Sequence, residues 1–177
     1  MKSSTLRSAE LTRRGLFASV AALALAGCQT TVRTPLAPPG FRISRFIVDA
    51  QPLRDLGGGY NADFLQKAVT EEATKQFASF MGGPKGNELT LQIGALQMPA
   101  QPDERFEVGF GGGNSNDYLD GVVIVKQGGV VNRYKFLTVT PSSAGGAWYL
   151  PDNVWRRERV LAQQYVEWVR REVFGSF

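Results

Sequence analysis

Histidine is absent from this sequence of 177 residues, and cysteine occurs once, at position 28. A Ser-His-Asp triad needs an imidazole, so this class of nucleophilic enzyme is excluded. A zinc site with histidine ligands is excluded for the same reason, and one thiol cannot build a site made of several thiolates. A single cysteine also excludes an internal disulfide framework. We therefore expect no metal and no cofactor.

The composition is that of a globular protein with many turns. Apolar residues make up 43% of the chain and charged residues 20%, and there are 20 glycines and 9 prolines. This balance argues against a disordered chain. The length suits one ordinary domain with short additional segments.

The first 27 residues have the pattern of a targeting segment. Basic residues precede an apolar run from Leu16 to Leu25, which is shorter than the ~20 apolar residues that a membrane span needs. Small residues follow, and the run ends in Leu25-Ala26-Gly27-Cys28. Together these features resemble the lipobox, the processing and acylation signal of bacterial lipoproteins.

The resemblance implies that signal peptidase II cleaves after Gly27. Cys28 then becomes the first residue of the mature chain, with a diacylglyceryl group on its sulfur and an acyl chain, for example palmitate, on its amine. Each buried methylene contributes about 0.8 kcal/mol, so two or more chains give a stable membrane anchor. The alternative is an ordinary secretory peptide followed by a chance cysteine, because small residues also precede ordinary cleavage sites.

Two export routes fit the leader. The run Thr12-Arg13-Arg14-Gly15-Leu16-Phe17 resembles the twin-arginine motif S/T-R-R-x-F-L, with Leu and Phe in reverse order. Arg13 and Arg14 would then direct export of a domain that folds before it crosses the membrane. The other route is a general secretory signal with two adjacent arginines. Gln29 follows the cysteine where Asp would favour retention, so the lipoprotein resemblance favours the periplasmic side of the outer membrane over the inner membrane.

Removal of the leader changes the net charge. The whole chain has 20 basic and 16 acidic residues, a net charge of +4. The leader holds four of the basic residues and one acidic residue, which leaves 16 basic and 15 acidic residues and a net charge of +1. A mature chain so close to neutrality gives no indication of nucleic-acid binding.

The mature chain divides into a tether and a domain. Residues 28–40 contain three prolines and a glycine, and we expect an extended, flexible tether there. Residues 41–177 are expected to form a single domain. Hydrophobic periodicity predicts helices from near Asn61 to Met81 and from Asp152 or Asn153 to just before Gly175. Strands are expected over residues 41–50, 88–98, 106–110, 118–126 and 130–140, with a further short strand at 148–150.

Two glycine positions refine this pattern. The phase of apolar residues shifts near Gly94, which suggests a bulge. The pair Gly128-Gly129 is typical of a two-residue hairpin turn.

Each predicted helix has one apolar stripe. The sequence therefore predicts an α+β fold in the order β-α-β-β-β-β-α, with two helices packed on one face of a mostly antiparallel sheet of about four to six strands.

Three segments have a partial likeness to chemical sites. The run from Gly57 to Ala62 fits a glycine-rich phosphate-binding pattern, but six residues separate it from the preceding strand, so we interpret it as a loop. The segment 109–117 lacks the residues of a calcium loop, and we interpret it as a strand connection suited to meeting a partner. The spacing of the scattered carboxylates does not indicate a catalytic pair of acid and base; these residues are Asp103, Glu104, Glu107, Asp117 and Asp120.

Three arginines begin the second predicted helix. Arg156, Arg157 and Arg159 lie in its first turns, where positive charge opposes the helix macrodipole. One interpretation is a contact surface for anionic lipid or an acidic partner. The other is three solvated arginines that Asp152 and Glu158 compensate.

The sequence favours a non-enzymatic, lipid-anchored lipoprotein that acts as an accessory or scaffold in a cell-envelope complex. Its expected partners are the membrane, through the lipid anchor, and an envelope protein, with no nucleic acid and no metal. The element order is similar to small two-helix, one-sheet lipoproteins that assist lipopolysaccharide assembly or ABC-type lipid transport, at the level of layout. One alternative is a ligand-binding lipoprotein that holds an apolar or anionic molecule in a pocket of at least ~300 Å³. Another is a histidine-free envelope enzyme with buried carboxylates of perturbed pKa.

Overall fold

Four strands and three α-helices build the part of the chain that the computed structural model describes, residues 34–99, 115–147 and 149–175. The strands are β1 (Arg45–Asp49), β2 (Glu88–Gln97), β3 (Asn116–Gln127) and β4 (Val130–Pro141). The helices are α2 (Gln51–Asp55), α3 (Gly59–Gln76) and α4 (Asn153–Phe174), with the 3₁₀ turns η1 (Ala78–Phe80) and η2 (Ser142–Gly145).

The strands of the described residues pair in the order β1-β2-β3-β4. β1 runs parallel to β2, while β2–β3 and β3–β4 are antiparallel. Gly128 and Gly129 connect β3 to β4 with φ angles of +54° and +87°, and a two-residue hairpin turn of the primed type needs positive φ at both positions. The β2–β3 register shifts between Ile93 and Ala95, so the predicted bulge is confirmed.

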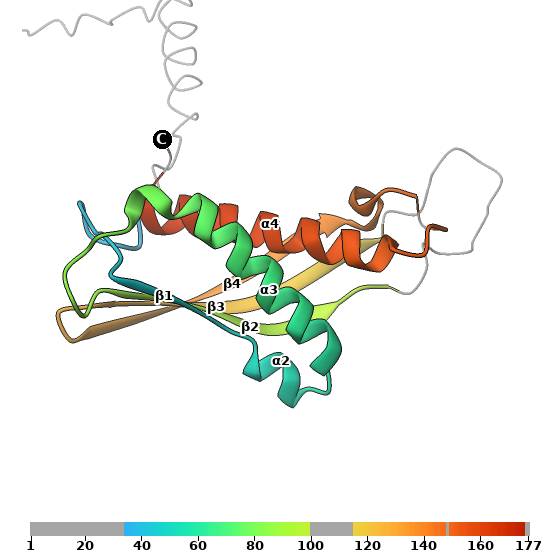
Figure 1. Ribbon diagram of the computed structural model, residues 1–177, viewed down its shortest axis with the longest axis horizontal. Helices are drawn as coiled ribbons and strands as arrows, with labels where there is room; N and C mark the ends of the chain where they lie inside the picture. Colours follow the sequence, from blue (N-terminus) through green and yellow to red (C-terminus); the bar gives the residue numbers. More distant parts are fainter. Residues whose placement is uncertain (1–33, 100–114, 148, 176–177) are drawn as a thin grey trace, which may run out of the picture. The chain divides into compact units, whose positions relative to one another are not determined.

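The helices α3 and α4 lie on the same side of the sheet (Figure 1). Their N-terminal ends meet where the Tyr60 ring lies 4.9 Å from the Trp155 ring. Their C-terminal ends meet where the Phe77 ring lies 5.8 Å from the Phe174 ring. The two helices therefore run roughly parallel, and each turns its apolar stripe inward.

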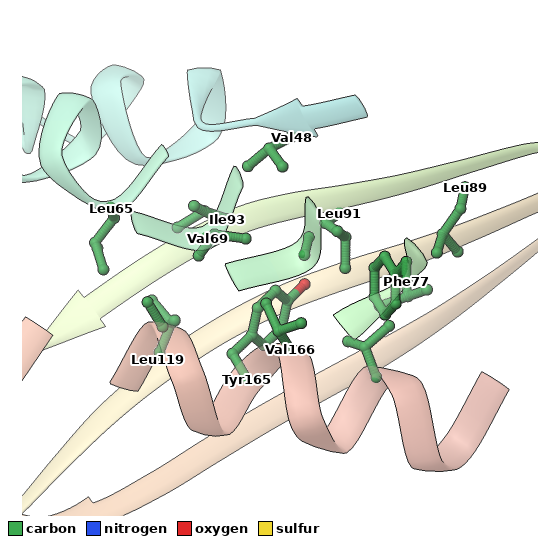
Figure 2. Packing of buried hydrophobic residues seen from close by; sticks show 14 of the residues in the cluster. Val48, Leu65, Val69, Phe77, Leu89, Leu91, Ile93, Leu119, Tyr165 and Val166 are labelled. Atoms are coloured by element: carbon green, nitrogen blue, oxygen red, sulfur yellow. The ribbon is translucent and has the colours of Figure 1, made fainter. Parts of the chain in front are cut away.

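The core lies between these helices and the sheet (Figure 2). Leu91 and Ile93 of β2 reach it by alternation along the strand, and both are fully buried. Tyr165 of α4 is also fully buried, and its hydroxyl donates a hydrogen bond to the Gln92 carbonyl at 3.3 Å. This close approach requires glycine at position 121, because a Cβ there would lie 2.7 Å from the Tyr165 hydroxyl oxygen.

The chain that precedes β1 is docked on the domain. The Leu36 and Ala37 backbone amides donate to the Glu172 and Val173 carbonyls of α4 at 2.8 and 3.1 Å. The Tyr134 hydroxyl of β4 donates to the Leu36 carbonyl at 3.4 Å, and Ala37 is buried. The segment expected as a flexible tether, residues 28–40, is therefore held against the domain from Leu36 onward.

The predicted fold agrees with the structure in its coarse form, which is an α+β fold with two long helices on one face of the sheet. The parallel pairing of β1 with β2 was not predicted, and α2 lies where a loop was expected. The element order among the described residues is β-α-α-β-β-β-α, which differs from the predicted order. Tyr149 and Leu150 form a turn and a bend instead of a strand, and the strand expected at 106–110 lies outside the described residues.

Replacement of Ala37 tests the docking of this segment. Ala37→Asp would bury an unpaired carboxylate, so we expect it to lower the free energy of unfolding by about 2 kcal/mol or more. The matched control is Thr34→Asp, because Thr34 is exposed. Urea denaturation of both variants measures the effect. Equal midpoints for the two variants would show that the segment does not stay docked.

Candidate functional site

A groove lies where the docked segment meets the C-terminal end of α4. Its lining consists of residues 34–42 together with Ser79, Phe80, Val173 and Phe174, and its volume is about 730 Å³. We call it the phenylalanine groove. This volume falls in the range of about 300–1,000 Å³ that is typical of ligand pockets.

An aromatic cluster belongs to the lining of the phenylalanine groove. The Phe80 and Phe174 rings stack with centroids 3.9 Å apart. The Phe41 ring also stacks with the Phe174 ring, with centroids 6.2 Å apart. Phe41 is buried, whereas Phe80 and Phe174 are half-buried. Three aromatic side chains therefore contribute to the lining of the groove.

The wall of the phenylalanine groove offers few polar groups. Three of its residues, at positions 35, 38 and 39, are prolines and have no backbone N–H. The amides of Leu36, Ala37 and Phe41 donate to carbonyl groups of the protein itself. The charged member of the lining is Arg42, which is exposed and donates from Nε to the Met81 carbonyl at 3.0 Å.

A second surface is the face of β3 and β4 that points away from α4, which we call the open sheet face. Leu119 and Val123 are buried on the helix side, so the alternate residues of β3 and their β4 neighbours point the other way. None of these side chains is buried; they are Tyr118, Asp120, Val122, Ile124, Lys126, Val131, Arg133, Lys135, Leu137 and Val139. Leu137 is 59% exposed and Val139 is 45% exposed.

A buried ion pair holds the other end of α4. Arg157 of α4 and Asp117 of β3 are both buried, and the Arg157 Nε donates to Asp117 Oδ2 at 2.8 Å. The Arg157 Nη2 donates to Asp117 Oδ1 and, at 3.0 Å, to the Pro99 carbonyl. The Ser142 hydroxyl donates to Asp117 Oδ1 at 2.6 Å. This ion-pair cluster joins β3, η2 and α4 to Pro99, which follows β2.

Two physical features keep this cluster intact. The Asp117 carboxylate raises the pKa of Arg157 because its hydrogen bonds favour the charged guanidinium. Gly145 lets η2 approach α4, since a Cβ there would lie 2.5 Å from Cγ of Arg157. The geometry therefore indicates a structural clamp between a strand and a helix.

The arginines expected as a basic contact surface are separated by the structure. Arg157 is not at the surface, which corrects both interpretations made from the sequence. Arg156 pairs with Asp152 at 2.6 Å, and this hydrogen bond lowers the pKa of Asp152. Arg159 is exposed, with Nη1 3.6 Å from Glu71 Oε2 and its guanidinium over the Phe64 ring. The three residues therefore face different partners within the protein.

Helical spacing contains a signal for the burial of Arg157. The residue stands at the head of a series spaced by four that continues through Leu161, Tyr165, Val169 and Val173, all of which are buried. An arginine on this series faces the sheet and needs an anion there. The sequence alone does not show which of the scattered carboxylates supplies it.

Glu158 is a buried carboxyl group that has no hydrogen-bond partner among the described residues. Its side chain is fully buried on α4, and neither carboxyl oxygen shares a hydrogen bond with any of those residues. Burial raises the pKa of Glu158 to about 7, because desolvation disfavours the ionised form. This residue was expected to compensate the neighbouring arginines, but the structure gives it no ion pair with any described residue.

The other candidate residues fall in several places. Gly27, Cys28, Arg13 and Arg14 lie outside the described residues, so lipidation and the export route stay predictions. Asp103, Glu104 and Glu107 also lie outside them, and Asp120 is exposed on the open sheet face. Gly58 precedes the first turn of α3, and α2 separates the glycine run from β1.

Within the described ranges, no three His, Cys, Asp or Glu side chains gather closely enough to hold a metal ion. No helix among these residues combines the length and the apolar character needed to cross a membrane. Comparison of the chain with protein-family models, curated proteins and solved structures yields no match.

Removal of one member of the buried ion pair tests the clamp. Asp117→Ala leaves the Arg157 charge buried and unpaired, so we expect the free energy of unfolding to fall by about 3–5 kcal/mol. Adding Arg157→Met removes the second charge and should recover part of this loss. Asp152→Ala, which breaks the exposed pair with Arg156, should leave the denaturation midpoint nearly unchanged. Similar midpoints for Asp117→Ala and Asp152→Ala would contradict the clamp.

Glu158 makes stability depend on pH. The folded state keeps a proton on Glu158 up to about pH 7, whereas the unfolded chain releases it near its ordinary pKa of 4.5. The free energy of unfolding should therefore fall as pH rises between these values, by on the order of 3 kcal/mol in total. Glu158→Gln should remove this decrease, and Glu167→Gln, at an exposed position of α4, should retain it. Urea denaturation across this pH range compares the variants, and an unchanged slope in Glu158→Gln would refute the assignment.

Proposed function

We propose that this protein is a bacterial lipoprotein, held by acyl chains on Cys28 to the periplasmic side of a membrane, with the outer membrane favoured. We further propose that it acts as a non-enzymatic accessory or scaffold in a cell-envelope complex. The lipobox supports the anchor. The open sheet face is the single observation that supports the partner role.

The open sheet face has the chemistry of a docking surface. Leu137 and Val139 lie next to each other on one side of β4 and are largely exposed, although the domain has a helix layer that buries other apolar side chains. Exposed apolar side chains grouped on one face favour contact with another protein. Arg133 and Lys135 lie beside them on the same strand and have no ion pair with any described residue. A partner that offers apolar and acidic side chains would complement this face.

The phenylalanine groove favours a second candidate function, the binding of an apolar or anionic molecule. Its volume of about 730 Å³ exceeds the ~300 Å³ expected for such a site, and three phenylalanines contribute to its lining. The groove lies between the docked segment and α4. Both functions are compatible in one anchored domain because the two surfaces use different residues.

Site-specific photocrosslinking in intact cells tests the partner role. A photoreactive amino acid at position 137 should give one discrete crosslinked species, because this position lies at the centre of the proposed contact. The matched control is position 154, where Val154 of α4 is 44% exposed on the helix layer and should give no such species. No crosslink at position 137, or the same species from both positions, would contradict the partner role.

A further inference from the structure

We infer that the phenylalanine groove binds one acyl chain of an anionic phospholipid from the membrane that carries the protein. The chain lies along the proline-rich wall, and the phosphate lies at Arg42. This deepens the second candidate function, and it rests on the proposed anchor at Cys28 for the position of the groove near a bilayer.

The lining of the groove matches an acyl chain. Three of its residues are prolines without N–H groups, and the amides of Leu36, Ala37 and Phe41 already donate within the protein, so its polar side chains are the Thr34 and Ser79 hydroxyls and Arg42. The stacked rings of Phe80 and Phe174 add apolar surface to the lining, and both side chains are half-buried. A hydrocarbon chain placed there removes apolar surface from water without leaving a polar group unpaired.

Arg42 supplies the charge that a phospholipid head group needs. It lines the groove, and its Nε and Nη2 atoms both donate to the Met81 carbonyl, which fixes the guanidinium at the rim. The Nη1 atom has no hydrogen bond with any described residue, and it can donate to a phosphate oxygen. A guanidinium suits phosphate because its donors match the geometry of the oxygens.

The position of the groove along the chain places it near the membrane. Thr34 lines the groove, and five residues separate it from Cys28, a span of six residue steps. An extended chain covers at most about 3.5 Å per residue, so Thr34 lies within about 20 Å of the proposed lipid attachment. Because Leu36 and Ala37 are docked on α4, the residues from Leu36 onward do not lengthen the connection between the groove and Cys28. A lipid therefore needs to move only a short distance from the bilayer to reach the groove.

Lipid photocrosslinking tests the inference on the full mature chain. The membrane-extracted protein is mixed with phosphatidylglycerol vesicles in which some lipids carry a diazirine on one acyl chain. The sample is floated on a density gradient, irradiated and mapped by peptide mass spectrometry. We expect crosslinks concentrated in residues 34–42, at Ser79 and Phe80, and at Val173 and Phe174. Crosslinks spread evenly over the surface would overturn the inference.

Paired variants separate the groove from general membrane contact. Ser79→Trp places a large ring at an exposed position of the lining and should reduce groove crosslinks several-fold, while Ser143→Trp, exposed on the 3₁₀ turn η2, should not. Arg42→Gln should lower crosslinking by phosphatidylglycerol roughly threefold or more relative to a zwitterionic phosphatidylcholine probe. Arg45→Gln, exposed on β1, should preserve that preference. Equal crosslinking in Ser79→Trp and Ser143→Trp would refute the site.

Flotation and crosslink mapping are read separately. Protein that stays at the bottom of the gradient, without floating with the vesicles, refutes the Cys28 anchor. The positions of the crosslinks test the lipid site in both the floating and the bottom fraction. Groove crosslinks that appear only in a Cys28→Ser chain would show that the acyl chain of the protein itself fills the groove. That result would overturn the assignment to a bilayer phospholipid.

Discussion

Burial of the apolar stripes of α3 and α4 against one face of the sheet is the constraint on which the rest of the structure depends. The helices run roughly parallel, so their C-terminal ends lie together, and Phe77 contacts Phe174 there. The docked segment uses this same end, because the last turn of α4 offers carbonyl groups that no helical amide satisfies. The helix layer covers one face of β3 and β4 and leaves the other exposed. The phenylalanine groove and the open sheet face therefore both follow from the packing of α3 and α4 on one face of the sheet.

The two ends of α4 have different chemistry. At its N-terminal end, Arg157 and Asp117 form a buried pair, which fixes the helix to the sheet with directional hydrogen bonds. At its C-terminal end, Phe174 contributes to an aromatic cluster that stays partly open to solvent. Glu158 lies next to Arg157 in sequence but has no hydrogen bond within the described part of the chain, and its burial opposes ionisation. Directional polar contacts thus lie at one end of α4 and a partly exposed aromatic cluster at the other.

Local patterns predicted the local features of the fold. The hairpin turn at Gly128-Gly129, the bulge near Gly94 and the helix α4 follow from residue type and periodicity, which act over a few residues. The parallel pairing of β1 was missed, because a five-residue strand contains no information about its neighbour. The prolines before β1 predicted an extended chain, but the docking of Leu36 depends on carbonyl groups 136 positions away in α4. The phenylalanine groove was missed for the same reason, since its walls come from three distant segments.

The central claim is that acyl chains on Cys28 hold this domain at a membrane. Intact-mass and N-terminal peptide mass spectrometry of the native protein, extracted from membranes with mild detergent, tests it most directly. The account predicts that the mature chain begins at Cys28 and carries the added mass of a diacylglyceryl group. A chain that begins elsewhere, or that has only the mass of its amino acids, would contradict it.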